Sequence, residues 1–184
     1  MSRHTLLICT GATFPFDQLF EVILASQDIL LFLHQNLQIT SVRVQYGPSS
    51  ESGTKFKRCL SNIDAKLLKK VDISGFGMTD KMAAEISASS IVISHAGTGT
   101  ILDTLRSTPA PQLIVIPNSV LMHGHQDEIA KALENRGCLI SVKELNEKEI
   151  LKSLESLSSK NFAPLPERKR LADLIDYEAG TLYT

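Results

Sequence analysis

Short apolar runs alternate with amphipathic stretches along most of this 184-residue chain. Apolar runs of about four to eight residues between turn residues are typical of buried strands, and apolar positions recurring at three- and four-residue steps are typical of helices. The runs predict strands over residues 5–9, 39–46, 70–76, 91–93, 113–116 and 138–142. The amphipathic stretches predict helices over 16–35, 79–88, 98–106, 126–135 and 146–157.

Local signals add detail at three places. The polar segment 49–61 is either an exposed loop or a short helix. Thr79 or Asp80 is the expected N-cap of the helix that runs to about Ala88, because both residue types accept hydrogen bonds from first-turn N–H groups. Gly137 stands where a glycine commonly ends a helix.

The alternation of strands with helices predicts an α/β fold with a Rossmann-like, doubly wound and mostly parallel sheet. We expect this domain to occupy residues 1–160. Residues 161–184 are then a proline-bounded linker and an amphipathic tail, in which Leu171, Leu174 and Ile175 recur at helical steps. This apolar stripe either packs on the chain's own sheet or seats a partner, and both can hold at once.

Composition and charge narrow the class of protein. Hydrophobic residues make up 43% of the chain, too many for a disordered protein, and the net charge of −1 argues against a general electrostatic grip on nucleic acid. The cysteines at 9, 59 and 138 form no CxxC pair, so we expect reduced thiols in a cytosolic protein. We expect no signal peptide, and the longest uninterrupted apolar run, 29–33, is too short to cross a bilayer.

The most informative segment is the turn Gly97-Thr98-Gly99-Thr100, which follows a buried strand and opens a helix. Glycines at such a turn let backbone N–H groups approach a phosphate at the positive end of the helix. They also occur where a strand and a helix simply pack closely, so the turn alone leaves both interpretations open. Leu102 stands where the dinucleotide fingerprint has its third glycine, and no Gly-Lys-Ser/Thr follows, so the turn is neither that fingerprint nor a P-loop.

Acidic and histidine residues flank this turn. Asp103, one helical turn further on, is either a solvated carboxylate or a bidentate acceptor for the hydroxyls of a ribose. His95 is either a capped structural histidine or a base. The run 123–128 contains histidines and carboxylates but lacks HxxxH or HExxH spacing, so we expect no metal site there.

Three stretches together resemble the nucleotide-sugar-binding half of the GT-B glycosyltransferases: Ile-Ser-His-Ala-Gly-Thr-Gly-Thr at 93–100, Leu-Ile-Val-Ile-Pro at 113–117 and His-Gln at 125–126. The subset that they resemble includes the bacterial enzyme that adds GlcNAc to the lipid-linked peptidoglycan precursor. The start, Cys-Thr-Gly-Ala-Thr at 9–13 followed by Phe16, Asp17 and Leu19, is similar to the soluble catalytic subunits of the eukaryotic UDP-GlcNAc transferase of dolichol-linked oligosaccharide synthesis.

The resemblance implies the fold of the C-terminal, donor-binding half of a GT-B enzyme. It also implies inverting transfer of the second GlcNAc from UDP-GlcNAc to GlcNAc-diphosphodolichol, with no metal or other cofactor. In the eukaryotic relatives a separate membrane-anchored chain binds the lipid-linked sugar acceptor. We therefore expect a heterodimer, with this chain cytosolic and recruited peripherally to the cytosolic face of the endoplasmic reticulum.

Residue roles follow from the same resemblance. The turn 97–100 is expected against the diphosphate, Asp103 against the ribose, and His125 and Gln126 near the GlcNAc hydroxyls. The family usually has Glu at the position of Asp103, and has Asn at that of Ile129. His95 is the local candidate for the general base, unless the partner supplies it. The expected substrate-binding residues are Gly11 and Thr13 on the first loop, then Gly97, Thr98, Gly99, Thr100, Asp103, His125, Gln126 and Asp127.

Two other function classes remain open at the level of sequence. One is a non-catalytic nucleotide-binding subunit of a complex. The other is a NAD(P)-linked oxidoreductase, against which the missing third glycine speaks.

Overall fold

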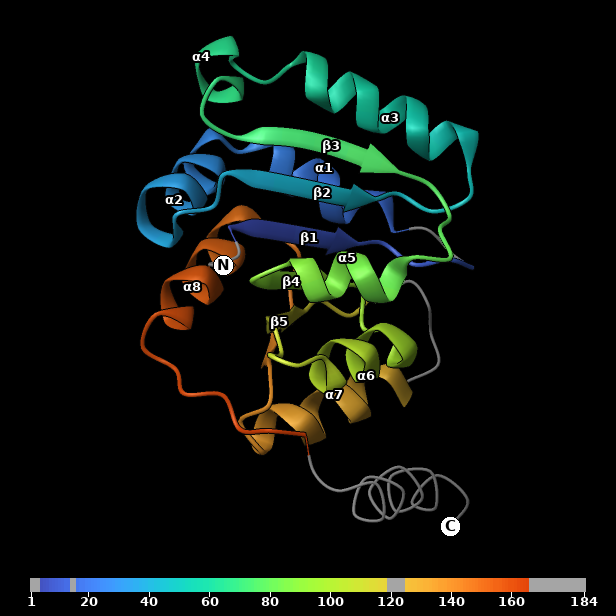
Figure 1. Cartoon of the computed structure of the whole chain (residues 1–184), viewed down its shortest axis with the longest axis vertical. Coiled ribbons are helices and arrows are strands. Elements are labelled where there is room, and N and C mark those ends of the chain that lie inside the picture. Colours follow the sequence, from blue (N-terminus) through green and yellow to red (C-terminus); the bar gives the residue numbers. More distant parts are fainter. Residues whose placement is uncertain (1–3, 14–15, 119–124, 166–184) are drawn as a thin grey trace.

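The computed structural model describes residues 4–13, 16–118 and 125–165, with the backbone alone at 125–128. Its centre is a six-stranded sheet, with every neighbouring pair parallel and the order β3-β2-β1-β4-β5-β6 (Figure 1). This order is the one typical of doubly wound nucleotide-binding folds, so the predicted fold class is confirmed. The strands are β1 (Thr5–Cys9), β2 (Ser41–Gln45), β3 (Asp72–Phe76), β4 (Ile91–Ser94), β5 (Gln112–Val115) and β6 (Ile140–Ser141).

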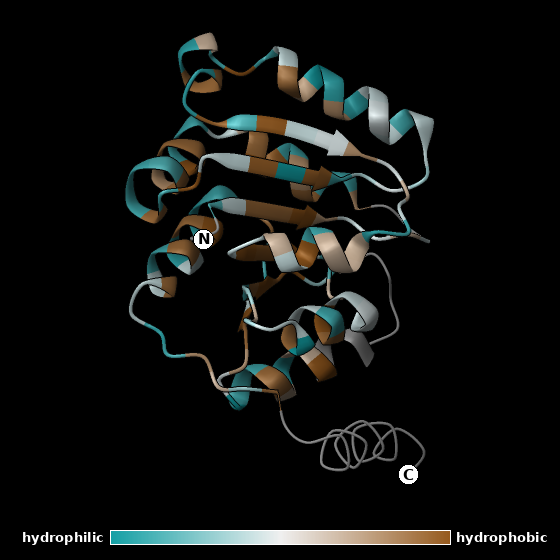
Figure 2. Cartoon of the chain, viewed as in Figure 1, coloured by the Kyte–Doolittle hydropathy of each residue, from teal (hydrophilic) through white to brown (hydrophobic). Residues whose placement is uncertain are grey.

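Helices cover both faces of the sheet. One core cluster joins Leu6 and Ile8 of β1 to α1, α2, α3 and α8, and a second joins Leu7 and Cys9 to α5, α6 and α7. Because successive strand residues point to opposite faces, β1 contributes to both cores; Figure 2 shows its hydrophobic colour. The helices are α1 (Asp17–Ala25), α2 (Gln27–Leu37), α3 (Ser50–Ser61), α4 (Ala65–Leu68), α5 (Met82–Ala88), α6 (Thr98–Arg106), α7 (His125–Asn135) and α8 (Glu147–Leu157).

The single helix predicted over 16–35 is wrong, because the segment forms two helices. Ser26 separates α1 from α2 with φ −91° and ψ 113°, and its side chain accepts a hydrogen bond from the Ile29 N–H as the N-cap of α2. The apolar spacing continues through Ser26, so periodicity carries no sign of the break.

The remaining helix ends are set by local hydrogen bonds. Segment 49–61 is helical, with Ser49 capping α3. The predicted start of α5 is too early, because the Thr79 hydroxyl accepts from the Lys81 N–H at 3.0 Å and caps a turn ahead of the helix. Gly137 ends α7 as predicted, with φ +74° and its N–H bonded to the Glu134 carbonyl.

The segment after α8 packs back against the domain. The Ala163 N–H donates to the Gly137 carbonyl at 3.0 Å, and Ala163 and Leu165 contact the second core cluster. The first residues of the predicted linker therefore lie on the domain surface, while the apolar stripe at 171–175 lies outside the described residues. None of the helices in the described part of the chain is long and apolar enough to cross a membrane.

Candidate functional site

A cavity of about 480 Å³ opens at the carboxyl edge of the sheet, beside the loops that follow β1 and β4. The strand order reverses between β1 and β4, and ligands of open α/β sheets bind in the crevice at that point. The lining residues come from four neighbouring segments at this edge. They are Gly11, Ala12, Thr13, Gln45, Met78, Thr79, Met82, His95, Gly97, Gly99, Thr100 and Asp103.

The loop after β1 is held by the end of β2. Gly11 has φ +105°, a backbone conformation that favours glycine. Its N–H donates to Oε1 of Gln45 at 3.3 Å, and Nε2 of Gln45 donates to the Gly11 carbonyl at 3.2 Å. The Thr10 hydroxyl donates to the main-chain carbonyl of Gln45 at 2.9 Å. The first loop is therefore fixed to β2 as well as to its own strand.

The loop after β4 places the imidazole of His95 between two glycines. A Cβ on Gly11 would stand 2.8 Å from Nε2 of His95, and a Cβ on Gly97 would stand 2.6 Å from the same atom. Real Cβ contacts are almost never this short, so the ring fits only because both positions lack a side chain. Ala96, which lies between His95 and Gly97 in the sequence, is buried and has φ +71°, a conformation that costs a non-glycine residue about 1 kcal/mol or more.

The hydrogen bonds of His95 determine which ring nitrogen carries the hydrogen. Its main-chain N–H and its Nδ1 both lie 3.2 Å from the Cys9 carbonyl. A carbonyl only accepts, so Nδ1 carries the hydrogen and the neutral ring keeps its lone pair on Nε2. Burial lowers the pKa of the imidazole, and the bond to Cys9 offsets part of that shift. His95 is therefore suited to accept a proton at Nε2 near neutral pH.

The first turn of α6 is open to an anion. Gly97 occupies the N-cap position and makes no side-chain capping hydrogen bond, so the first-turn N–H groups have no side-chain acceptor of that kind. A Cβ on Gly99 would meet no atom within 4 Å, which leaves room for a ligand at this position. Asp103 is exposed and lines the same cavity one turn further along. This arrangement suits a diphosphate with a hydroxyl-bearing sugar next to it.

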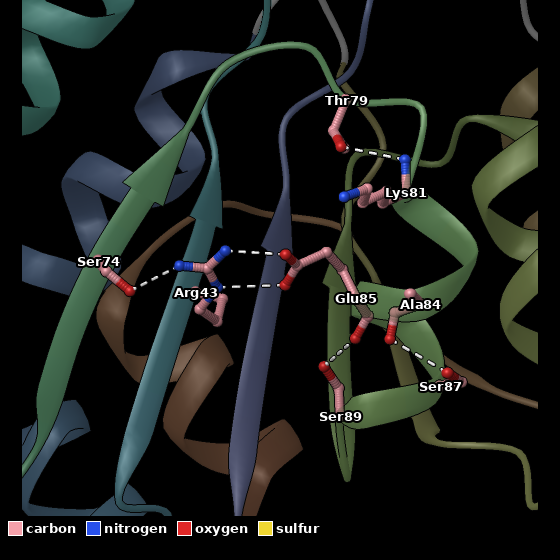
Figure 3. Close-up of polar contacts among 8 residues, drawn as sticks. All are labelled: Arg43, Ser74, Thr79, Lys81, Ala84, Glu85, Ser87 and Ser89. Carbon is pink, nitrogen blue, oxygen red and sulfur yellow. Dashed lines mark hydrogen bonds and ion pairs between the residues drawn. The ribbon is translucent and has the colours of Figure 1, made fainter.

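The opposite wall comes from α5 and the segment before it. Met78, Thr79 and Met82 line the cavity, and the Met78 side chain is 59% exposed. Figure 3 shows how α5 is tied to the sheet: both carboxylate oxygens of Glu85 accept from Arg43 on β2, at 2.8 and 3.1 Å. Arg43 also donates to the Ser74 hydroxyl on β3 at 2.9 Å. This bidentate ion pair fixes the helix that carries the wall.

Most of the residues expected from the sequence meet at this cavity. Gly11, Thr13, His95 and Asp103 line it together with the turn 97–100, except for Thr98, which is not among the lining residues. His125, Gln126 and Asp127 lie at the start of α7, and their side chains are outside the described part, so their role stays a prediction. Sequence reasoning missed Ala12, Gln45, Met78, Thr79 and Met82. Their only sequence signal is that they lie at or beyond the carboxyl ends of the predicted strands.

A reactive thiol and a metal-binding group are the other kinds of site that could occur among the described residues near this edge. Burial and the nearby Glu85 carboxylate raise the pKa of the Cys9 thiol to about 12, so it stays protonated. Over the residues that the structure describes, no three His, Cys, Asp or Glu side chains gather into a metal-binding group.

Comparison with known proteins gives one consistent family. A profile of the glycosyltransferase family 28 C-terminal domain matches residues 5–178. The UDP-N-acetylglucosamine transferase subunit ALG13 of Yarrowia lipolytica is 35% identical over 164 residues, covering 88% of this chain and 76% of the relative. The ALG13 subunit of Debaryomyces hansenii is 30% identical over a 197-residue alignment, covering 89% of this chain and 92% of the relative.

Solved structures agree with the sequence relatives. An NMR solution structure of ALG13 superposes with a TM-score of 0.65 at 26% identity, covering 90% of both chains. A crystal structure of Acinetobacter baumannii MurG superposes with a TM-score of 0.62 at 14% identity, covering 96% of this chain and 50% of that one. The second likeness bears on the fold alone, and it covers about half the length of that protein.

Proposed function

Since the chain belongs to the glycosyltransferase family 28 C-terminal domain family and is a homologue of the ALG13 subunits, we propose that it is the donor-binding catalytic subunit of a UDP-N-acetylglucosamine transferase. The reaction that we propose adds the second GlcNAc to GlcNAc-diphosphodolichol. The donor domain is residues 1–160, and 161–184 is a tail that helps to seat the partner.

The observation that carries this proposal is the composition of the cavity. It combines the open N-terminus of α6, the Asp103 carboxylate and the Nε2 atom of His95 within one space at the strand-order reversal. These groups suit the diphosphate, the ribose and a transferred proton respectively. In this arrangement UDP lies over 97–103, and the GlcNAc extends toward His125, Gln126 and Asp127.

The proposed chemistry is a single inverting displacement. The 4-hydroxyl oxygen of the acceptor sugar attacks the anomeric carbon, the bond from that carbon to the diphosphate oxygen breaks, and UDP leaves with the electron pair. The first-turn N–H groups of α6 stabilise the charge that develops on the leaving oxygen. The hydroxyl proton passes to Nε2 of His95 or to a base on the partner chain.

A partner subunit completes the site. The relatives are named as subunits, which supports an assembly, and the identity of the second chain is our proposal. We propose a membrane-anchored chain that binds the lipid-linked acceptor and recruits this chain to the cytosolic face of the endoplasmic reticulum. Gly11 and Thr13, on the loop after β1, are placed to face that acceptor.

The test uses the full chain, alone and with membranes that carry the candidate partner. Calorimetry should detect UDP binding to the chain alone, and UDP-GlcNAc turnover on a dolichol-linked acceptor should require both components. His95→Gln should keep UDP binding within a few-fold while lowering turnover by a factor on the order of 10². If the complete assembly binds UDP but transfers no GlcNAc, the chain is a non-catalytic nucleotide-binding subunit instead. Full turnover by the chain alone would exclude the two-subunit arrangement.

A further inference from the structure

Gln45 at the carboxyl end of β2 is buried, at 3% exposure, and both described hydrogen bonds of its side chain go to the backbone of one residue, Gly11. The amide oxygen accepts from the N–H of Gly11, and the amide nitrogen donates to the carbonyl of the same residue. This reciprocal pair matches the side chain to both polar groups of Gly11. A side chain that lacks either the donor or the acceptor cannot replace it.

The main chain of Gln45 holds the preceding residue as well. Its carbonyl accepts from the N–H of Thr10 at 3.2 Å and from the Thr10 hydroxyl at 2.9 Å. Four hydrogen bonds from one residue therefore fix the path of the chain at residues 10–11. Gly11 needs this support, because φ +105° is one of many conformations open to a free glycine.

The held loop in turn contacts the imidazole of His95. The space beside Gly11 is so narrow that a Cβ there would stand 2.8 Å from Nε2 and 3.0 Å from Cε1 of the ring. Gly97 lies at a similar separation from the same two ring atoms. Displacing the backbone of Gly11 would therefore expose part of the ring to water and free it to move.

We propose that Gln45 is a positioning residue, which holds the Gly11 loop against His95 and so fixes the direction in which Nε2 faces the cavity. The proposal rests on the function given above and deepens it, because it makes a residue of β2 responsible for the position of the proton-accepting imidazole. Gln45 acts through Gly11 and not as the base itself. Its contribution should therefore appear in the turnover number more than in donor affinity.

The variant pair Gln45→Met and Gln112→Met separates positioning from stability. Methionine has nearly the shape of glutamine and removes both hydrogen bonds to Gly11. Gln112 is a matched control, because it is the first residue of β5 and so lies at the amino ends of the strands, away from the cavity. Its Nε2 donates to the Leu157 carbonyl at 3.1 Å. Both variants lose side-chain hydrogen bonds, but only Gln45→Met loses them at the cavity.

Two readouts are needed, and one does not depend on transfer. The first is NMR titration of the His95 imidazole in the full free chain, with UDP absent. In Gln45→Met the midpoint should rise toward that of an ordinary histidine, because water reaches the ring, whereas Gln112→Met should leave it unchanged. Asp103 is the other acidic or basic side chain lining the described cavity, and it is retained in every variant.

The second readout is the kinetics of the chain with its partner membranes. Gln45→Met should lower kcat by about tenfold or more while KM for UDP-GlcNAc changes by less than about threefold, since small displacements of reacting groups are costly. Gln112→Met should retain both constants. If Gln45→Met does not fold, Gln45→Asn replaces it, because it keeps an uncharged amide but is one methylene too short to reach both polar groups of Gly11. It should give a smaller loss of kcat in the same direction.

The outcomes are distinct. An unchanged His95 titration in a folded Gln45 variant overturns the proposal, and so does an equal loss of kcat in Gln112→Met. If the wild-type assembly transfers no GlcNAc, the proposed function fails, while the titration still decides whether Gln45 holds His95.

Discussion

Nε2 of His95 lies 2.6 Å from the point at which a Cβ on Gly97 would stand, whereas a Cβ on Gly99, two residues later, would meet no atom within 4 Å. The two glycines of this turn therefore have different functions. Gly97 makes room for a side chain of the protein itself. Gly99 leaves space that the protein does not fill, on the side of the cavity where we place the diphosphate.

This difference gives a paired prediction. Gly97→Ala should displace the His95 ring and reduce both stability and turnover. Gly99→Ala should raise the free energy of unfolding by up to about 1 kcal/mol, because alanine favours the helix, while weakening UDP binding. Thermal unfolding and calorimetry with UDP measure the two effects. Gly99→Ala with unchanged UDP affinity would argue against a phosphate at this turn.

Asp103→Ala should weaken UDP binding by about tenfold with little change in stability, since an exposed carboxylate on a helix contributes about 0.3–1 kcal/mol to folding. The matched control is Asp28→Ala, in the first turn of α2 on the opposite face of the sheet, which should leave UDP affinity unchanged. 2′,3′-Dideoxy-UDP, which lacks both ribose hydroxyls, should bind the wild type and the variant equally. Equal UDP affinity in all three proteins would make Asp103 a solvated carboxylate only.

The burial of His95 predicts a specific pH dependence. Its pKa is lower in the folded chain than the ordinary value of 6.5, so the unfolded chain binds the proton more readily. The stability that this group contributes is fully present above pH 6.5 and is lost as the pH falls below it. His95→Gln should therefore lose less stability than the wild type between pH 7.5 and about 5.5. Denaturant unfolding at several pH values measures the difference, and parallel curves would contradict it.

The pair of Arg43 and Glu85 is predicted to stabilise α5. Both side chains are less than one third exposed, and the bidentate geometry adds to the attraction. Arg43→Lys should cost about 1–2 kcal/mol of unfolding free energy, because lysine cannot make the fork of two bonds. A double-mutant cycle with Glu85→Gln should give a coupling on the order of 1 kcal/mol. A coupling near zero would make the pair a surface contact without energetic weight.

The sequence predicts the strands correctly where buried apolar runs determine their positions. The apolar runs of β1, β4 and β5 have one plausible place, inside a sheet covered on both faces, so the strand positions were predictable to within a residue or two. The break at Ser26 and the late start of α5 depend on single side-chain hydrogen bonds, which leave the apolar spacing unchanged. Such bonds are not visible in a hydrophobic pattern.

The sequence predicted which site residues lie together where they are close in the chain, but not where they come from distant segments. The turn 97–100 and Asp103 are close in sequence, so their proximity follows from the first turn of one helix. Gln45 and Met82 reach the same cavity only through the strand order, which places the end of β2 and the start of α5 near β1 and β4. The fit of His95 between Gly11 and Gly97 depends on distances of a few tenths of an ångström, which no sequence pattern contains.

The central position of β1 has a consequence for synthesis of the chain. This strand is made before both of its neighbours, and it pairs on one edge with β2 and on the other with β4, so that Leu6 acquires its partner Ile91 only after the residues between them have been made. Until then one edge of an apolar strand has no hydrogen-bonding partner and is open to other chains. A ribosome stalled between β2 and β4 would therefore expose an aggregation-prone intermediate. Synonymous codon substitutions that slow translation in this interval should reduce the yield of soluble protein without changing its final stability.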